Sequence, residues 1–112
     1  MNKCIYQIEL PEDQDVEAFV TFMREEYFPA VDRGPTRVGA VTGLALLQRL
    51  DVHSHEAGAD NAHEFYLHVD WSGLPGCRDS YVNDEEIRRK FESFGARVKP
   101  LGYYVEHGEV EE

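Results

Sequence analysis

The spacing of hydrophobic residues changes repeatedly along the chain, in an order that predicts strand, helix, strand, strand, helix, strand. Residues 3–10 alternate between apolar and polar, as in a strand with one buried side. Residues 43–52 and 63–71 form the next two predicted strands, separated by a polar hairpin loop at 53–62. The 63–71 strand has the cleanest alternation. It places Phe65, Leu67, Val69 and Trp71 on one face and Glu64, Tyr66, His68 and Asp70 on the other.

The first predicted helix carries an apolar stripe at three- and four-residue spacing. Its members are Val16, Phe19, Val20, Met23 and Tyr27. Asp13 precedes the stripe and is the expected N-cap, because a carboxylate accepts hydrogen bonds from the free N–H groups of the first turn. Pro29 lacks a backbone N–H, so we expect the helix to end or kink near Phe28.

A second, shorter helix is predicted from the stripe of Ile87, Phe91 and Phe94. Asn83 and Glu86 have the spacing of a capping box at its start, and Gly95 fits the end of the helix. A fourth strand is expected after Pro100, at Leu101 to Val105. The predicted fold class is therefore α+β.

Two short helices cover only one face of a four-stranded sheet, so the other face needs a different partner. The 43–52 strand is apolar on both sides, which is typical of a strand covered twice. The uncovered face would carry Ile5, Gln7, Tyr66, His68 and Tyr104. This amphipathic set suits an interface or a lined cavity better than a dry core, so we expect a homodimer.

Length and charge narrow the classes of function. A chain of 112 residues fits a single domain, expected at 1–108, followed by an acidic tail at 109–112. A net charge of -11 without a basic stripe argues against a nucleic-acid partner. Two cysteines, Cys4 and Cys77, make no disulfide framework. No leader-like or membrane-spanning run is visible, so a cytoplasmic protein without a membrane partner is expected.

Three segments carry a family resemblance that spans nearly the whole chain. They are Glu25-Glu26-Tyr27-Phe28-Pro29-Ala30-Val31, Thr42-Gly43-Leu44-Ala45-Leu46-Leu47-Gln48-Arg49 and Phe65-Tyr66-Leu67-His68-Val69-Asp70-Trp71-Ser72. With Pro29 after the first helix and Trp71 closing the third strand, the chain resembles the ferredoxin-like dimeric α+β barrel superfamily, which includes antibiotic-biosynthesis-type monooxygenases, EthD-like proteins and stress-responsive barrel proteins. The resemblance implies a βαββαβ domain with a four-stranded antiparallel sheet, two helices on one face, and a barrel closed by a dimer. Activities in that superfamily range from cofactor-free oxygenation to none known.

The resemblance suggests a cofactor-free, monooxygenase-like enzyme acting on a small aromatic or polyketide-like substrate in a pocket between sheet and helices. His68 is the candidate proton acceptor, because a neutral imidazole accepts a proton from a phenol or enol near neutral pH. Tyr66 is grouped with it as catalytic. Candidate substrate contacts are Tyr104, Trp71, Gln7 and Arg37, with Trp71 as an apolar wall and Arg37 near the pocket mouth. The alternative is a non-catalytic dimer that binds a small molecule or a protein, in which His68 is hydrogen-bonded in an interface and Trp71 anchors the core.

The loop between the second and third strands offers one competing chemistry. His53, His55 and His63, with Glu56 as a further ligand, would suit zinc or another divalent ion. Their spacing matches no closed structural site, so we expect no metal and no cofactor. The glycines and arginines of the 32–42 connection lack a phosphate-loop ending and are interpreted as turns.

Overall fold

A computed structural model describes residues 2–31, 40–49, 63–72, 82–105 and 107. The elements are β1 (Asn2–Glu9), α1 (Val16–Phe22), η1 (Met23–Tyr27), α2 (Phe28–Ala30), β2 (Val41–Gln48), β3 (Glu64–Trp71), α3 (Glu85–Ser93) and β4 (Arg97–Val105). The predicted order of strands and helices is confirmed. Arg37, Cys77, His53 and His55, together with the 109–112 tail, lie outside the described residues.

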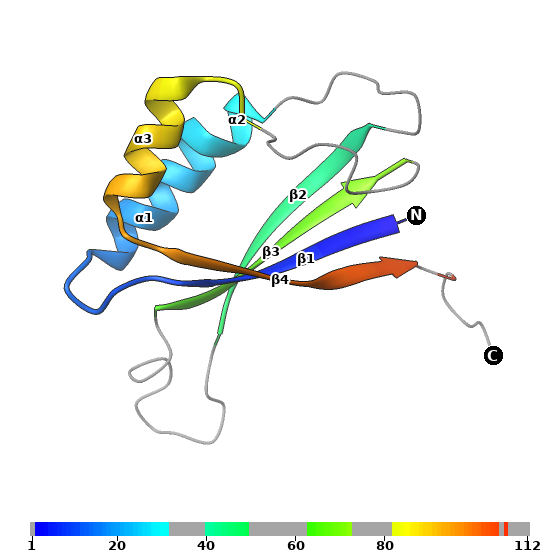
Figure 1. Ribbon diagram of the computed structural model, residues 1–112, viewed down its shortest axis with the longest axis horizontal. Coiled ribbons are helices and arrows are strands. Elements are labelled where there is room, and N and C mark those ends of the chain that lie inside the picture. Colours follow the sequence, from blue (N-terminus) through cyan, green and yellow to red (C-terminus); the bar gives the residue numbers. More distant parts are fainter. Residues whose placement is uncertain (1, 32–39, 50–62, 73–81, 106, 108–112) are drawn as a thin grey trace.

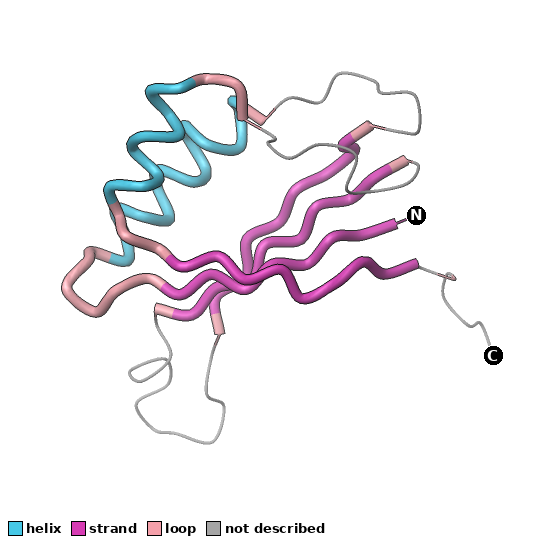
Figure 2. Tube along the Cα trace, viewed as in Figure 1, coloured by secondary structure: helices cyan, strands magenta, loops and turns pink. Residues whose placement is uncertain are grey.

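The strands form a four-stranded antiparallel sheet in the order β2-β3-β1-β4 (Figures 1 and 2). The two central strands, β1 and β3, are therefore not consecutive in the chain. The helical segments lie together on one side of the sheet (Figure 1). This confirms the predicted α+β class, and the arrangement is compatible with a ferredoxin-like fold.

The hydrophobic core lies between the helices and one face of the sheet. Its buried members are Cys4, Ile8, Leu10, Phe19, Phe22, Met23, Val31, Val41, Phe65, Leu67, Val69, Trp71 and Val82. Phe19 of α1 is fully buried, and its ring centroid lies 5.2 Å from that of Phe65 in β3 and 5.3 Å from that of Phe94 beyond α3. One aromatic ring thus joins both helices to the sheet. No described helix is long and apolar enough to cross a membrane.

Both helices begin one or two residues later than the sequence suggested. The side chain of Asp15, rather than Asp13, accepts hydrogen bonds from the backbone N–H groups of Glu17 and Ala18. Asp84, rather than Asn83, does the same at α3. The predicted caps were wrong because several adjacent acidic or amide residues satisfy the same preference, so the sequence pattern alone does not select among them.

The first helical segment continues past Phe28 instead of ending there. Met23–Tyr27 forms a π-helical turn, η1, in which the backbone N–H of Phe28 donates to the carbonyl of Met23. In a regular α-helix the ring of Pro29 would collide with the carbonyl of Glu25. The wider turn relieves that collision, so one further helical turn, α2, follows before the chain leaves the helix at Val31.

β4 begins at Arg97, four residues before the predicted start at Leu101. Pro100 pairs with Tyr6 of β1 at a register shift, and β4 is an edge strand of the sheet. An edge position tolerates proline because half of the backbone N–H groups there need no partner strand. The turn before β4 contains Gly95 at φ 68°, a left-handed conformation that favours glycine, as predicted for the end of α3.

Candidate functional site

The sheet surface opposite the helices, called the open face from here on, gathers most of the predicted site residues. Strand register places fifteen side-chain positions on it: Lys3, Ile5, Gln7, Glu9, Gly43, Ala45, Leu47, Glu64, Tyr66, His68, Asp70, Arg97, Lys99, Gly102 and Tyr104. None of the described helices covers this face (Figure 1).

His68 lies in the middle of the open face. Strand pairing aligns it with Ile5 of β1 and Ala45 of β2, and Ile5 in turn pairs with Gly102 of β4. The side chain is half-buried, and within the described part of the chain its imidazole has no hydrogen-bond partner. Small residues on the two outer strands flank a larger central pair. The row therefore ends in the small residues Ala45 and Gly102, with His68 and Ile5 at its centre.

Tyr66 is held by an intramolecular hydrogen bond. Its hydroxyl donates to Oε2 of Glu64 over 2.7 Å, on the same strand and the same face. This bond to a carboxylate raises the pKa of Tyr66 above its usual value, and it is the main reason that the pKa of Glu64 is lowered. The hydroxyl of Tyr66 therefore donates its proton to Glu64 in this structure. The catalytic role of Tyr66 stays a prediction.

Glu64 also contacts two other side chains at this end of the open face. The Nη1 atom of Arg49 lies 3.2 and 3.3 Å from its two carboxylate oxygens, and the side chain of Gln7 bonds it as well. Three neighbours on β1, β3 and the end of β2 thus share one carboxylate. Neither Glu64 nor Arg49 was among the site residues predicted from the sequence. The alternation that put Glu64 beside Tyr66 on one face was the only signal available.

A second ion pair stands at the other end of the face. Nζ of Lys3 lies 3.6 Å from Oδ1 of Asp70 on the neighbouring strand. Gly43 lies beside Asp70 on β2, and a Cβ added there would be 3.0 Å from Oδ2 of Asp70. Glycine at this position lets the carboxylate pack against the backbone of the β2 bulge. Ion pairs therefore stand at both ends of the face, Lys3 with Asp70 at one end and Arg49 with Glu64 at the other, and His68 lies between them on β3.

The remaining candidates are divided between two faces of the sheet. Tyr104 is on the open face of β4, next to Lys3, and is 47% exposed. Trp71 is fully buried in the core under the helices. Trp71 and His68 therefore point to opposite sides of β3 and do not line one surface. Of the predicted set, His68, Tyr66, Gln7 and Tyr104 come together.

The metal-binding alternative involves His53, His55 and Glu56, which lie outside the described residues. No cluster of three or more histidine, cysteine, aspartate or glutamate side chains that could hold a metal ion occurs among the residues that the structure describes. Of the loop histidines, only His63 is described. Its Nδ1 atom is buried and makes no hydrogen bond.

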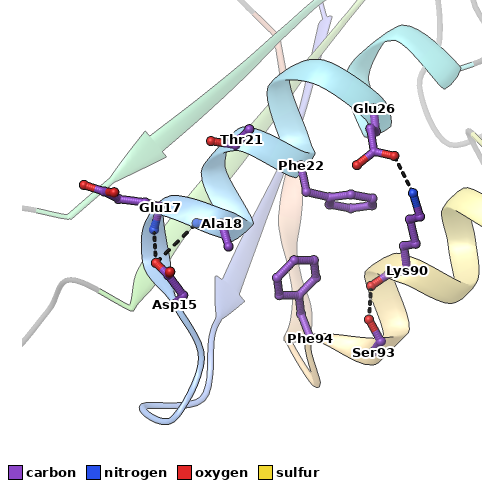
Figure 3. A pocket seen from close by; sticks show the side chains of 9 residues that line it. All are labelled: Asp15, Glu17, Ala18, Thr21, Phe22, Glu26, Lys90, Ser93 and Phe94. Atoms are coloured by element: carbon purple, nitrogen blue, oxygen red, sulfur yellow. Dashed lines mark hydrogen bonds and ion pairs between the residues drawn. The ribbon is translucent and has the colours of Figure 1, made fainter.

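A hollow lies between α1 and α3, away from the open face (Figure 3). It measures about 550 Å³ and is lined by Asp15, Glu17, Ala18, Thr21, Phe22, Glu26, Lys90, Ser93 and Phe94. The rings of Phe22 and Phe94 face each other at its floor, with centroids 5.4 Å apart. Lys90 donates to Glu26 over 2.7 Å across its rim, and this bond raises the pKa of Lys90. None of the predicted site residues lines it.

Charge is distributed unevenly between the two sides of the molecule. The helical segments with their flanking turns, residues 11–31 and 82–96, carry ten acidic and four basic side chains. The open face carries the three acidic residues Glu9, Glu64 and Asp70, and the four basic residues Lys3, Arg49, Arg97 and Lys99. Counting only the residues that the structure describes, the open face is thus the side that a second copy can approach with less repulsion.

Comparison of the chain with protein-family models, with curated proteins and with solved structures gives no significant match.

Proposed function

We propose that the protein is a homodimer in which the open faces of two sheets pack together and enclose a space that binds a small aromatic molecule. In this proposal the domain is a ferredoxin-like βαββαβ unit, and the dimer is an α+β barrel. Three observations support it. The open face has no cover among the described residues, it mixes half-buried apolar and hydrogen-bonding side chains, and it is close to charge balance while the helical side is acidic.

The position of His68 is the observation that supports the ligand-binding part of the proposal. It stands at the centre of the open face beside Ile5 and Ala45, with no partner for its imidazole among the described residues. A neutral imidazole accepts a hydrogen bond or a proton best from a weakly acidic hydroxyl, such as that of a phenol or an enol. Apolar neighbours would hold the ring of the ligand, and closure by the second subunit would exclude water from the hydrogen bond.

The dimer is tested with a matched pair of substitutions. Ala45→Arg places a charged side chain on the open face, and Ala18→Arg places the same side chain on the exposed surface of α1. Sedimentation equilibrium should give a dimer for the wild type and for Ala18→Arg, and a folded monomer for Ala45→Arg. A wild type that is monomeric at micromolar concentration, or an Ala45→Arg variant that stays dimeric, would contradict the proposal.

A second candidate function is cofactor-independent monooxygenation in the same space, and the unpartnered imidazole of His68 favours it. Proton transfer from a phenol to His68 would leave an anion that reacts with dioxygen. One oxygen atom would enter the ring as a quinone oxygen, and the other would leave as water with the phenol and ring hydrogens. His68→Ala in a dimer that keeps all turnover on a panel of phenols would refute this role.

A further inference from the structure

The strongest unexplained feature outside the His68 row is a basic corner of the open face, formed by Arg97 and Lys99 of β4. Both residues alternate onto this face, where they stand opposite Glu9 and Gln7 of β1. Together these four side chains and Val98 line a hollow of about 160 Å³. The corner is continuous with the rest of the open face, because Gln7 pairs with Tyr66 on its other side.

The ion pairing of the face leaves this corner with unbalanced positive charge. Lys3 lies within ion-pair distance of Asp70, and Arg49 contacts Glu64. Arg97 and Lys99 make no ion pair with a described residue, although Glu9 is the strand partner of Arg97. Two cations two residues apart on one strand face repel each other unless an anion lies between them. The only carboxylate lining the hollow is Glu9, so one positive charge is left over.

We infer that this corner binds the carboxylate of the ligand, with Arg97 and Lys99 as its charged contacts and Gln7 at the inner wall of the hollow. This inference rests on the proposed function, because it adds a contact for the other end of the same ligand, whose hydroxyl bonds His68. Arginine and lysine bind oxyanions through short, charge-assisted hydrogen bonds. The ligand class is thereby narrowed from a small aromatic to an aromatic hydroxy acid.

The spacing of the two ends sets the size of that acid. Lys99 and His68 are separated by two strand spacings across the sheet and two residues along it. With strands about 4.8 Å apart and residues rising about 3.4 Å each, their backbone positions are about 12 Å apart. Both side chains extend above the sheet and shorten the gap. A molecule of two fused rings, with its carboxylate and hydroxyl at opposite ends, spans what remains.

The test compares two probes that differ only in the carboxylate. 6-Hydroxy-2-naphthoate has both groups, and 2-naphthol has the hydroxyl alone. Calorimetric titration of the wild-type protein should show at least about tenfold tighter binding of the naphthoate, the factor expected for one charge-assisted contact. The Arg97→Gln/Lys99→Gln variant should lose this difference and keep its affinity for 2-naphthol. His68→Gln should weaken binding of both probes.

A matched control removes two cations elsewhere. Arg24→Gln/Arg88→Gln makes the same change in net charge on the exposed surfaces of η1 and α3 and should leave both affinities unchanged. Equal binding of the two probes by the wild type, or equal loss in the control variant, would overturn the carboxylate site while leaving the His68 site in place. Dissociation of the Arg97→Gln/Lys99→Gln dimer would overturn it too, by showing that the two cations bind the second subunit. Absence of binding by either probe would overturn the carboxylate site and the proposed ligand site together.

Discussion

The hydrogen bond from Tyr66 to Glu64 gives the sharpest prediction about the open face. Replacing Tyr66 with Phe removes only the hydroxyl, so the ring stays and the bond to Oε2 of Glu64 is lost. A hydrogen bond to a charged group contributes about 1.5–3 kcal/mol when it is buried. Glu64 keeps its contacts with Arg49 and Gln7, and 18% of its side chain is exposed, so water replaces part of the lost bond. We expect Tyr66→Phe to lower the free energy of unfolding by about 1 kcal/mol at neutral pH.

The pH dependence of this loss separates the bond from a simple packing effect. The pKa of Glu64 is lowered in the folded state, so its contribution to stability is full above the unfolded pKa and is lost as pH falls through the folded pKa. The difference between wild type and Tyr66→Phe should therefore shrink in acid. At the alkaline end the pKa of Tyr66 is raised in the folded state. The stabilisation is present below the unfolded pKa of tyrosine and is lost as pH rises through the folded value.

Urea denaturation of four proteins provides the measurement: wild type, Tyr66→Phe, Glu64→Gln and the double variant. The double-variant cycle should give a coupling energy of about 1 kcal/mol at neutral pH. Tyr103→Phe is the matched control, because Tyr103 is 64% exposed and should show no change. In the Glu64→Gln variant, ultraviolet titration should show a Tyr66 pKa closer to the usual value of tyrosine. A Tyr66→Phe loss equal to that of Tyr103→Phe, or one that is the same in acid as at neutral pH, would refute the reasoning.

Three further predictions concern the scaffold and are measured by chemical or thermal denaturation. Asp15→Ala should destabilise the protein by about 1 kcal/mol because α1 loses its N-cap, while Asp13→Ala should have little effect; equal losses would contradict the observed cap. Gly95→Ala should destabilise it by about 1 kcal/mol because φ is 68° there, and Gly95→Asn should be milder since asparagine tolerates this conformation; the reverse order would argue against a left-handed turn. Phe19→Ala should remove about 3–5 kcal/mol, because its buried ring contacts both helices and the sheet; a loss near 1 kcal/mol would mean that the core is not built around it.

The strands could be predicted because burial of one face of the sheet makes apolar and polar side chains alternate along each strand. In β3 the residues from Phe65 to Trp71 are buried at every second position, as the sequence pattern required. The same alternation already separated Trp71 from His68, since the two differ by an odd number of positions. The prediction that Trp71 and His68 line one pocket was therefore inconsistent with the alternation of side chains along the strand. The helix starts were less predictable, because neighbouring residues such as Asp13 and Asp15 have the same intrinsic capping preference.

The contacts of the open face depend on information that the sequence pattern lacks. The pairing of Glu64 with Arg49 joins residues from two strands, and it follows from register rather than from local spacing. The same holds for Arg97 and Lys99, which become a corner of the face only when β4 pairs with β1. Similarly, a proline after a helix can either end the helix or be accommodated by a π-helical turn, as at Met23–Tyr27. Which of the two occurs depends on how the following residues pack, and the sequence pattern does not show this.

The uneven distribution of charge has a practical consequence for handling the protein. An anion-exchange resin, or any solid support coated with amines, would capture the molecule by its acidic helices, which the proposed dimer leaves on its outer surface. The two sheets would stay packed against each other, so adsorption to such a support should leave the dimer and its enclosed space intact.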